Sequence, residues 1–132
     1  MIKRPTHARF NAAILEGRKI TTIRAKPWPV GIPIMIYNWS GVAYRSPQID
    51  LAPVVVLKHV PIEITYDLGW MFYKHESINA KPLHVTEGFD SQRAMDDWFR
   101  LLVRPGEVIT QHLMLFSLWS PKVSSGEREN KS

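Results

Sequence analysis

Short segments rich in β-branched and aromatic residues recur along most of this chain, and they limit the possible folds more than any other feature. Such residues favour pleated strands, and turn residues at Ser40-Gly41 and Asp67-Leu68-Gly69 separate the segments. Residues 41–50 are predicted as a loop or a short hairpin, and residues 75–85, where the periodicity fades, as a loop. Strands are predicted over residues 32–39, 52–60, 62–66, 70–73 and 108–119, with one more following a basic stretch at residues 17–24.

Two short helical patterns lie near the two ends of the chain. In the first, Thr6 is the predicted N-cap and Gly17 the exit. In the second, Asp90 or Ser91 is the predicted N-cap of a helix that ends in D-D-W-F. Its apolar stripe, expected to face the core, repeats at helical spacing in Met95, Trp98, Phe99 and Leu102.

The order of these elements predicts an α+β fold. There is no βαβ alternation and no internal repeat. We expect a small closed or nearly closed β-barrel of about six strands flanked by two or more short helices. A chain of 132 residues supports one core, so we predict a single domain over residues 1–120 and a polar, flexible tail over residues 121–132.

Composition narrows the cellular setting. The chain has no cysteine, which excludes disulfides and thiolate metal sites and fits a reducing compartment. No apolar run approaches membrane-spanning length and no apolar signal core follows the N-terminus. We therefore expect a cytoplasmic protein without a membrane partner.

Charge is concentrated in the N-terminal part. The formal net charge is +5, and within the first 26 residues Glu16 is the only acid. A one-signed surface attracts phosphate-bearing partners, such as RNA or nucleotides. Basic residues also keep small proteins soluble, and composition does not separate these two explanations. The basic residues of this region are Lys3, Arg4, Arg9, Arg18, Lys19, Arg24 and Lys26.

The stretch G-R-K-I-T-T-I-R at residues 17–24 carries the first candidate catalytic group. Lys19 and Thr22 are three residues apart, so they lie on opposite faces of a flat strand but converge in a turn or bulge. A desolvated lysine has a lowered pKa and can accept the proton of a nearby hydroxyl. The alternative is a solvated basic turn that leads into an ordinary strand.

A second group of candidates lies in loops. Glu87 precedes Gly88 and the second helix, where a carboxylate can transfer a proton, bind a base edge, or simply interact with the helix dipole. Arg24 offers a planar fork of donors to a phosphate or a carbonyl. Rings in or beside loops can stack on a nucleobase or pack as lid or core residues; those considered are Trp28, Trp39, Tyr44 and Trp70.

Metal and nucleotide-triphosphate chemistry have no sequence signature here. The five histidines include no pair at i, i+4 and no accompanying carboxylate motif. There is no glycine-rich phosphate loop. We therefore predict neither a metal nor a cofactor.

The motifs follow a fixed order over residues 6–119: a helix, G-R-K-x-x-T-x-R, strands, E-G-F-D-S, a helix ending in D-D-W-F, and a last strand. Taken together, this order resembles the ASCH family of the PUA-like superfamily. The pattern is most similar to the small bacterial N4-acetylcytidine amidohydrolase family. The resemblance implies hydrolysis of the amide on the exocyclic N4 of an acylated cytosine base or nucleoside. It implies Lys19 as the base, Thr22 as the nucleophile and Glu87 as the acid/base, without a metal.

Two departures and two alternatives accompany this resemblance. The segment at residues 27–53 is longer and more aromatic than in the compact enzymes, which suggests a different or wider pocket, and its Pro- and Trp-rich loop leaves the acyl-group range open. The candidate substrate contacts are Arg24, Trp28, Trp39 and Tyr44. Other ASCH proteins are associated with single-stranded RNA binding and Mg-dependent ribonuclease activity, and a non-catalytic RNA-binding module is a third possibility. The sequence leaves open the acyl group, the form of the substrate and the oligomeric state.

Overall fold

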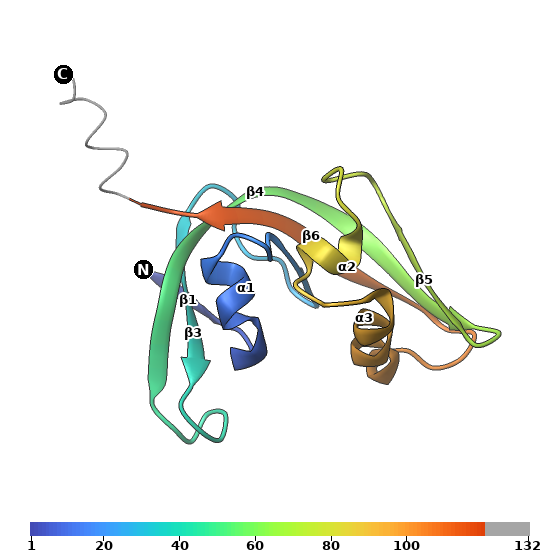
Figure 1. The fold of residues 1–132 in the computed structure, drawn as a ribbon, viewed down its shortest axis with the longest axis horizontal. Helices are drawn as coiled ribbons and strands as arrows, with labels where there is room; N and C mark the ends of the chain where they lie inside the picture. Colours follow the sequence, from blue (N-terminus) through green and yellow to red (C-terminus); the bar gives the residue numbers. More distant parts are fainter. Residues whose placement is uncertain (121–132) are drawn as a thin grey trace.

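The computed structural model of the protein describes residues 1–120, and the predicted tail at residues 121–132 lies outside the described residues. Figure 1 shows the order of the elements along the chain. The helical segments are a 3₁₀ turn at Ala8–Phe10, α1 (Asn11–Leu15), α2 (Leu83–Thr86), α3 (Gln92–Phe99) and a 3₁₀ turn at Arg100–Leu102. The strands are β1 (Ile2–Pro5), β2 (Thr21–Arg24), β3 (Pro33–Trp39), β4 (Gln48–Asp67), β5 (Trp70–His75) and β6 (Val108–Leu118).

The strands form one six-stranded sheet in the order β1-β3-β4-β6-β2, and β5 pairs with β4. Among the strand pairs of residues 1–120, β1–β3 is parallel and the others are antiparallel. The α+β class and the number of strands are confirmed. The sheet is not closed, because β1 and β2, each four residues long, end the strand order without pairing with each other in the described part of the chain.

Strand β4 is one continuous element of 20 residues, where two strands at residues 52–60 and 62–66 were predicted. Pro61 caused this error, because proline lacks the N–H that a central ladder requires. Pairing with β3 ends at Val55 and pairing with β5 begins at Ile62, so at Pro61 only β6 flanks the strand. A register shift between Val56 and Lys58 accompanies the long curve of β4 in Figure 1.

The helix ends follow the sequence in part. The Nδ1 atom of His7, not Thr6, accepts from the Arg9 N–H at the first helical turn. Gly17, with φ of +76°, follows α1 as predicted. The Ser91 hydroxyl accepts from the Ala94 N–H and caps α3. Strand β1 and helix α2 were missed, because each has only four residues and no clear period.

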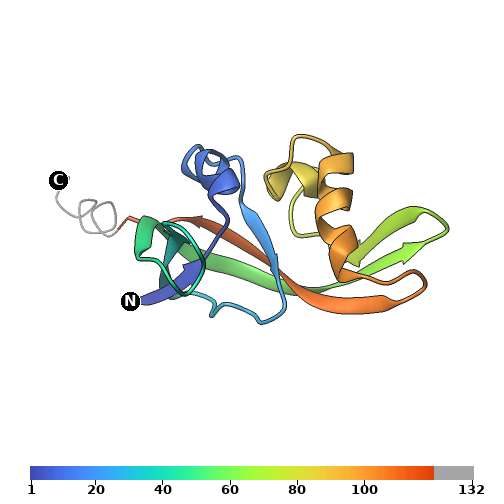
Figure 2. The ribbon, with the colours of Figure 1, turned by 90° about the horizontal axis from the view of Figure 1, so that it is seen from below.

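The helices α1, α2 and α3 lie on the same side of the sheet (Figure 2). Met95 and Phe99 of α3 are buried against the core, as predicted. Trp98 is 36% exposed and Leu102 is 53% exposed, so the predicted core stripe is only half buried. No helix among residues 1–120 is both long and apolar enough to cross a membrane.

Candidate active site

Backbone hydrogen bonds bring the loop before β2 against the end of α2. The N–H groups of Arg18 and Lys19 both donate to the carbonyl of Ala13, which turns the chain after Gly17. The Ile20 N–H then donates to the Thr86 carbonyl at 2.9 Å. Lys19 therefore precedes the flat part of the strand, and its side chain lies beside Glu87, 68 residues further along the chain.

The Lys19 ammonium is held in a buried polar environment. The side chain is 4% exposed, and Nζ donates to the carbonyls of Thr21 at 2.8 Å and Glu87 at 2.7 Å. The Glu87 carboxylate oxygen Oε1 lies 3.8 Å from Nζ. Burial lowers the pKa of Lys19 from 10.5 to about 8, the Glu87 carboxylate opposes this change, and the Arg24 charge adds to it.

Gly88 makes room for this lysine. Its φ is +91°, which L-residues rarely adopt. A Cβ atom at this position would lie 3.1 Å from both Cβ and Cδ of Lys19. The close approach of the two segments therefore requires glycine, and it helps to exclude water from the Lys19 stem.

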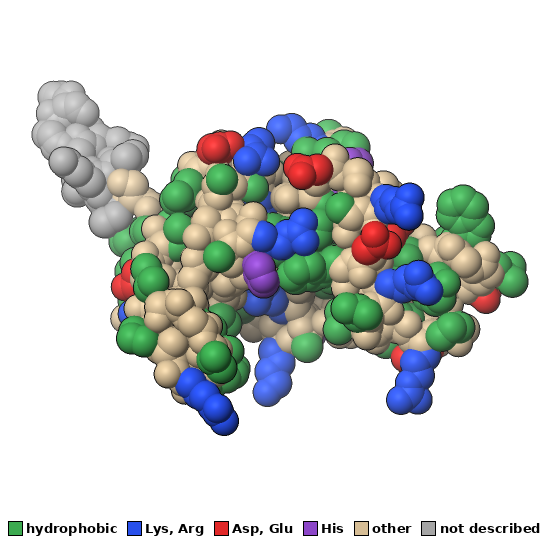
Figure 3. All heavy atoms as spheres, turned by 60° about the horizontal axis from the view of Figure 1, so that its bottom comes forward, with side chains coloured by type: hydrophobic (Ala, Val, Ile, Leu, Met, Phe, Trp, Pro, Cys, Tyr) green, Lys and Arg blue, Asp and Glu red, His purple; other side chains and the backbone are tan. Residues whose placement is uncertain are grey.

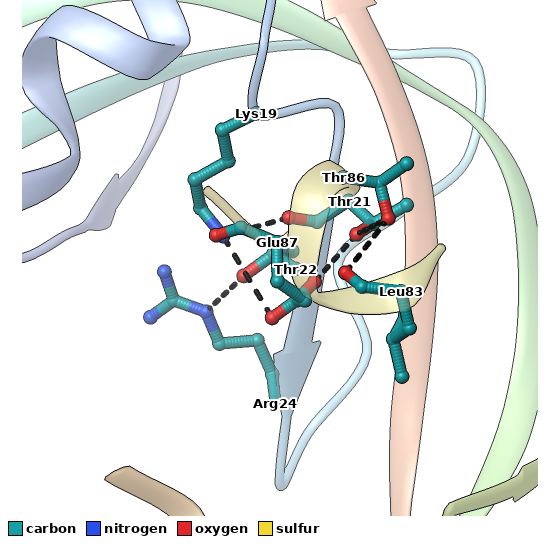
Figure 4. Close-up of polar contacts among 7 residues, drawn as sticks. All are labelled: Lys19, Thr21, Thr22, Arg24, Leu83, Thr86 and Glu87. Atoms are coloured by element: carbon teal, nitrogen blue, oxygen red, sulfur yellow. Dashed lines mark hydrogen bonds and ion pairs between the residues drawn. The ribbon is translucent and has the colours of Figure 1, made fainter. Parts of the chain in front are cut away.

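The Glu87 carboxylate is held by the hydroxyl of Thr21, which lies beside that of Thr86 (Figure 4). Glu87 is 2% exposed, and the Thr21 hydroxyl donates to its Oε2 at 2.6 Å. The hydroxyl oxygens of Thr21 and Thr86 are 3.0 Å apart, and Thr86 also bonds the Leu83 carbonyl. This short charge-assisted bond orients the carboxylate so that Oε1 faces Lys19.

Thr22 has a different partner. Its hydroxyl oxygen accepts from Nε of Arg24 at 2.9 Å. The Arg24 guanidinium also lies over the Trp28 ring, with Cζ 4.8 Å from the ring centroid. Burial lowers the pKa of Arg24, and the Glu87 carboxylate partly opposes that effect.

These side chains share one cavity of about 130 Å³. Its polar lining is formed by Lys19, Thr22, Arg24 and Glu87, and the rest of its lining is largely aromatic. The rings of Phe10, Phe89 and Trp98 contact one another with centroid separations of 5.3–5.9 Å. The remaining lining residues are Thr6, His7, Ile23 and Phe99.

The cavity contains four of the seven predicted site residues. Lys19, Thr22, Arg24 and Glu87 line it, whereas Trp28 is buried behind Arg24. Trp39 and Tyr44 pack on each other in the β3–β4 hairpin, with ring centroids 5.2 Å apart, outside the residues that line the cavity.

Sequence reasoning missed the contribution of Thr21 and the aromatic wall. Thr21 alternates with Thr22 along β2, so its side chain was not expected beside Glu87. The available signals were the phenylalanine directly after Glu87-Gly88 and the tryptophan of the α3 stripe, which had been assigned to the core.

Metal-ligating residues do not gather anywhere in residues 1–120: no group of three or more His, Asp or Glu side chains is placed to hold an ion. No family model, curated protein or solved structure matches the chain.

Proposed function

We propose that the protein is an amidohydrolase of the ASCH type that removes a small acyl group from the exocyclic N4 amine of cytosine or cytidine. The observation that carries this proposal is the convergence of Lys19, Thr22 and Glu87 on one cavity, with the lysine buried beside the carboxylate. An amine, an alcohol and a carboxylate in one partly enclosed cavity supply a base, a nucleophile and an acid.

Lys19 is suited to the role of base. A neutral amine has two N–H donors and one lone pair, and two backbone carbonyls already accept from Nζ. With both donors engaged, the lone pair is the group left to accept a proton. The Glu87 oxygen Oε1 lies 3.8 Å from Nζ and the centroid of the Phe10 ring lies 4.6 Å from it. A pKa of about 8 means that an appreciable fraction of this amine is neutral near pH 7.

The reaction then proceeds in two stages, transfer of the acyl group to Thr22 and hydrolysis of the resulting ester. The Thr22 oxygen attacks the acyl carbonyl carbon while its proton passes to Lys19, and a tetrahedral oxyanion forms. The C–N bond breaks as the proton that Lys19 took from Thr22 passes to the leaving nitrogen, directly or through the Glu87 carboxylate. The nitrogen becomes the free amino group of cytidine, and Lys19 is neutral again. Neutral Lys19 then takes a proton from water, which attacks the carbonyl carbon of the threonine ester. The lysine ammonium returns that proton to the Thr22 oxygen as its bond to the carbon breaks, which releases the carboxylic acid and restores the threonine hydroxyl.

The cavity volume supports a small substrate portion. At about 130 Å³ it is close to the ~150 Å³ of an apolar protein cavity that accommodates benzene. A volume of this size accommodates the acyl group and part of the pyrimidine ring, so the rest of the base and the ribose would remain outside. Of the three rings in the cavity wall, Phe10 and Phe89 are buried and Trp98 is 36% exposed, so Trp98 is the ring on which a pyrimidine would stack.

The test is turnover of N4-acetylcytidine in the presence of excess chelator, followed by the ultraviolet change to cytidine. We expect turnover by the unmodified protein, retention of part of it by Thr22→Ser, and loss of it in Lys19→Met and Thr22→Val. Glu87→Gln should keep only a small residual activity. Lys26→Met, which changes an exposed lysine, is the matched control and should keep full activity. No turnover by the folded unmodified protein would refute the proposal.

A second candidate, a single-stranded RNA-binding protein with Mg-dependent ribonuclease activity, is favoured by the exposed basic side chains. Figure 3 displays several Lys and Arg side chains on one face. The Arg9 guanidinium lies 5.2 Å from the ring centroids of both Phe89 and Trp98, beside the cavity. Cleavage of an RNA oligomer that requires added magnesium, without deacylation of acetylcytidine, would favour this candidate.

A further inference from the structure

The guanidinium of Arg24 is placed to do more than bind the edge of a base. Its Nε donates to the Thr22 hydroxyl oxygen at 2.9 Å, while in the described part of the chain neither terminal nitrogen makes a hydrogen bond. Arg24 lines the same cavity as Lys19 and Glu87. An arginine fork with one nitrogen engaged and its other nitrogens uncommitted is suited to a second oxygen beside the first.

We propose that Arg24 is a catalytic residue that orients Thr22 and binds the oxyanion of the tetrahedral intermediate, an inference that rests on the proposed function. In that intermediate the threonine oxygen and the oxyanion are bonded to the same carbon. Two oxygens on one carbon match the spacing of a carboxylate, which a guanidinium binds through two parallel N–H donors. Nε would keep its bond to the threonine oxygen, and the adjacent terminal nitrogen would donate to the oxyanion.

This arrangement favours the transition state over the bound substrate. The carbonyl oxygen of the substrate is neutral and becomes charged only as the Thr22 oxygen bonds to carbon, so the donor gains most at that moment. Burial strengthens the interaction, because the low dielectric around Arg24 reduces screening. Stacking on Trp28 holds the guanidinium plane in place, so little reorganisation is needed.

The same contact directs the proton of Thr22. Because the hydroxyl oxygen accepts from Nε, its own hydrogen must point away from Arg24. Lys19 lines the same cavity and is the base proposed to accept this proton. The Arg24 charge also lowers the pKa of Lys19, so removal of Arg24 would shift the basic form of the lysine to higher pH.

The first test compares Arg24→Met and Arg24→Lys with a matched control. Arg100 also stacks on an aromatic ring, with Cζ 4.8 Å from the centroid of Tyr66, and it does not line the cavity, so Arg100→Met removes a similar contact elsewhere. We expect Arg24→Met to lower kcat by about 100- to 1,000-fold with little change in KM, as for loss of an oxyanion donor. Arg24→Lys should recover little, because a point charge lacks the fork.

The second test does not depend on the substrate. Methylboronic acid forms a tetrahedral anion when the Thr22 oxygen bonds to boron and the hydroxyl proton passes to Lys19, and ¹¹B NMR distinguishes trigonal from tetrahedral boron. We expect the unmodified protein and Arg100→Met to form this adduct, Thr22→Val to form none, and Arg24→Met to bind at least 10-fold more weakly. Circular dichroism and thermal melting would verify that each variant is folded.

The outcomes separate the two proposals. If the unmodified protein deacylates acetylcytidine and forms the adduct, but Arg24→Met matches it in both assays, the role of Arg24 is refuted alone. If the protein forms an Arg24-dependent adduct without deacylating acetylcytidine, the proposed substrate is refuted and the role of Arg24 stands. If neither turnover nor adduct is seen with folded protein, both are refuted.

Discussion

The pKa of Lys19 predicts how the activity depends on pH. Burial lowers the pKa of the Lys19 ammonium from 10.5 to about 8. This shift means that the charged form loses about 3 kcal/mol of stability relative to the neutral form. At pH 7, roughly 10% of such lysines are neutral, compared with roughly 0.03% at a pKa of 10.5. Burial therefore raises the fraction of active base by about 300-fold at neutral pH.

The assay is kcat/KM for acetylcytidine from about pH 6 to about pH 9.5. Because the neutral amine is the active form, log kcat/KM should rise with a slope of one and level off near pH 8. The Glu87 carboxylate raises the pKa of Lys19, so the residual activity of Glu87→Gln should level off at a lower pH.

A profile that is flat, or that falls with rising pH over this range, would refute Lys19 as the base. Lys26→Met serves as the control, since an exposed lysine that does not line the cavity should leave the midpoint where it is. If the midpoint of the pH profile moved equally in Glu87→Gln and Lys26→Met, the shift would come from the net charge of the protein and not from the contact between Glu87 and Lys19.

Three further predictions concern stability. The pKa of Lys19 is lower in the folded than in the unfolded chain, so the unfolded chain binds more protons between about pH 8 and 10.5. Denaturant unfolding of the unmodified protein and of Lys19→Met, measured across that window, should therefore show the free energy of unfolding of the unmodified protein rising by about 3 kcal/mol relative to the variant. The same pH dependence in both proteins would contradict a buried ammonium with a lowered pKa. Gly88→Ala should lower the free energy of unfolding by about 1–2 kcal/mol because of its positive φ, and should lower kcat because the added Cβ displaces Lys19. Gly17→Ala is the control: its φ is +76° and no atom lies within 4 Å of the added Cβ, so it should lower the melting temperature and leave kcat unchanged. Met95→Ala should cost about 2–5 kcal/mol in denaturant unfolding, because the fully buried side chain would leave a cavity.

Local features of the chain were the most predictable. The β-forming segments lie in strands, Ser91 caps α3 and Gly17 ends the first helical segment. These features depend on interactions within about four residues, so local sequence is sufficient. The strand break predicted at Pro61 was wrong because it depends on distant residues. The missing N–H of Pro61 would interrupt the strand only if a neighbouring strand needed that donor, and this depends on which strands flank β4.

The amino-acid sequence by itself determined the α+β class, the basic N-terminal region and the supply of an amine, hydroxyls and a carboxylate as candidate chemistry. Only the tertiary structure decided that the sheet stays open, that Thr21 rather than Thr22 bonds Glu87, and that Trp98 joins the cavity wall. The physical reason is distance along the chain. Lys19 and Glu87 are 68 residues apart, and their contact exists because α1, β2 and α2 pack together, which no local propensity specifies.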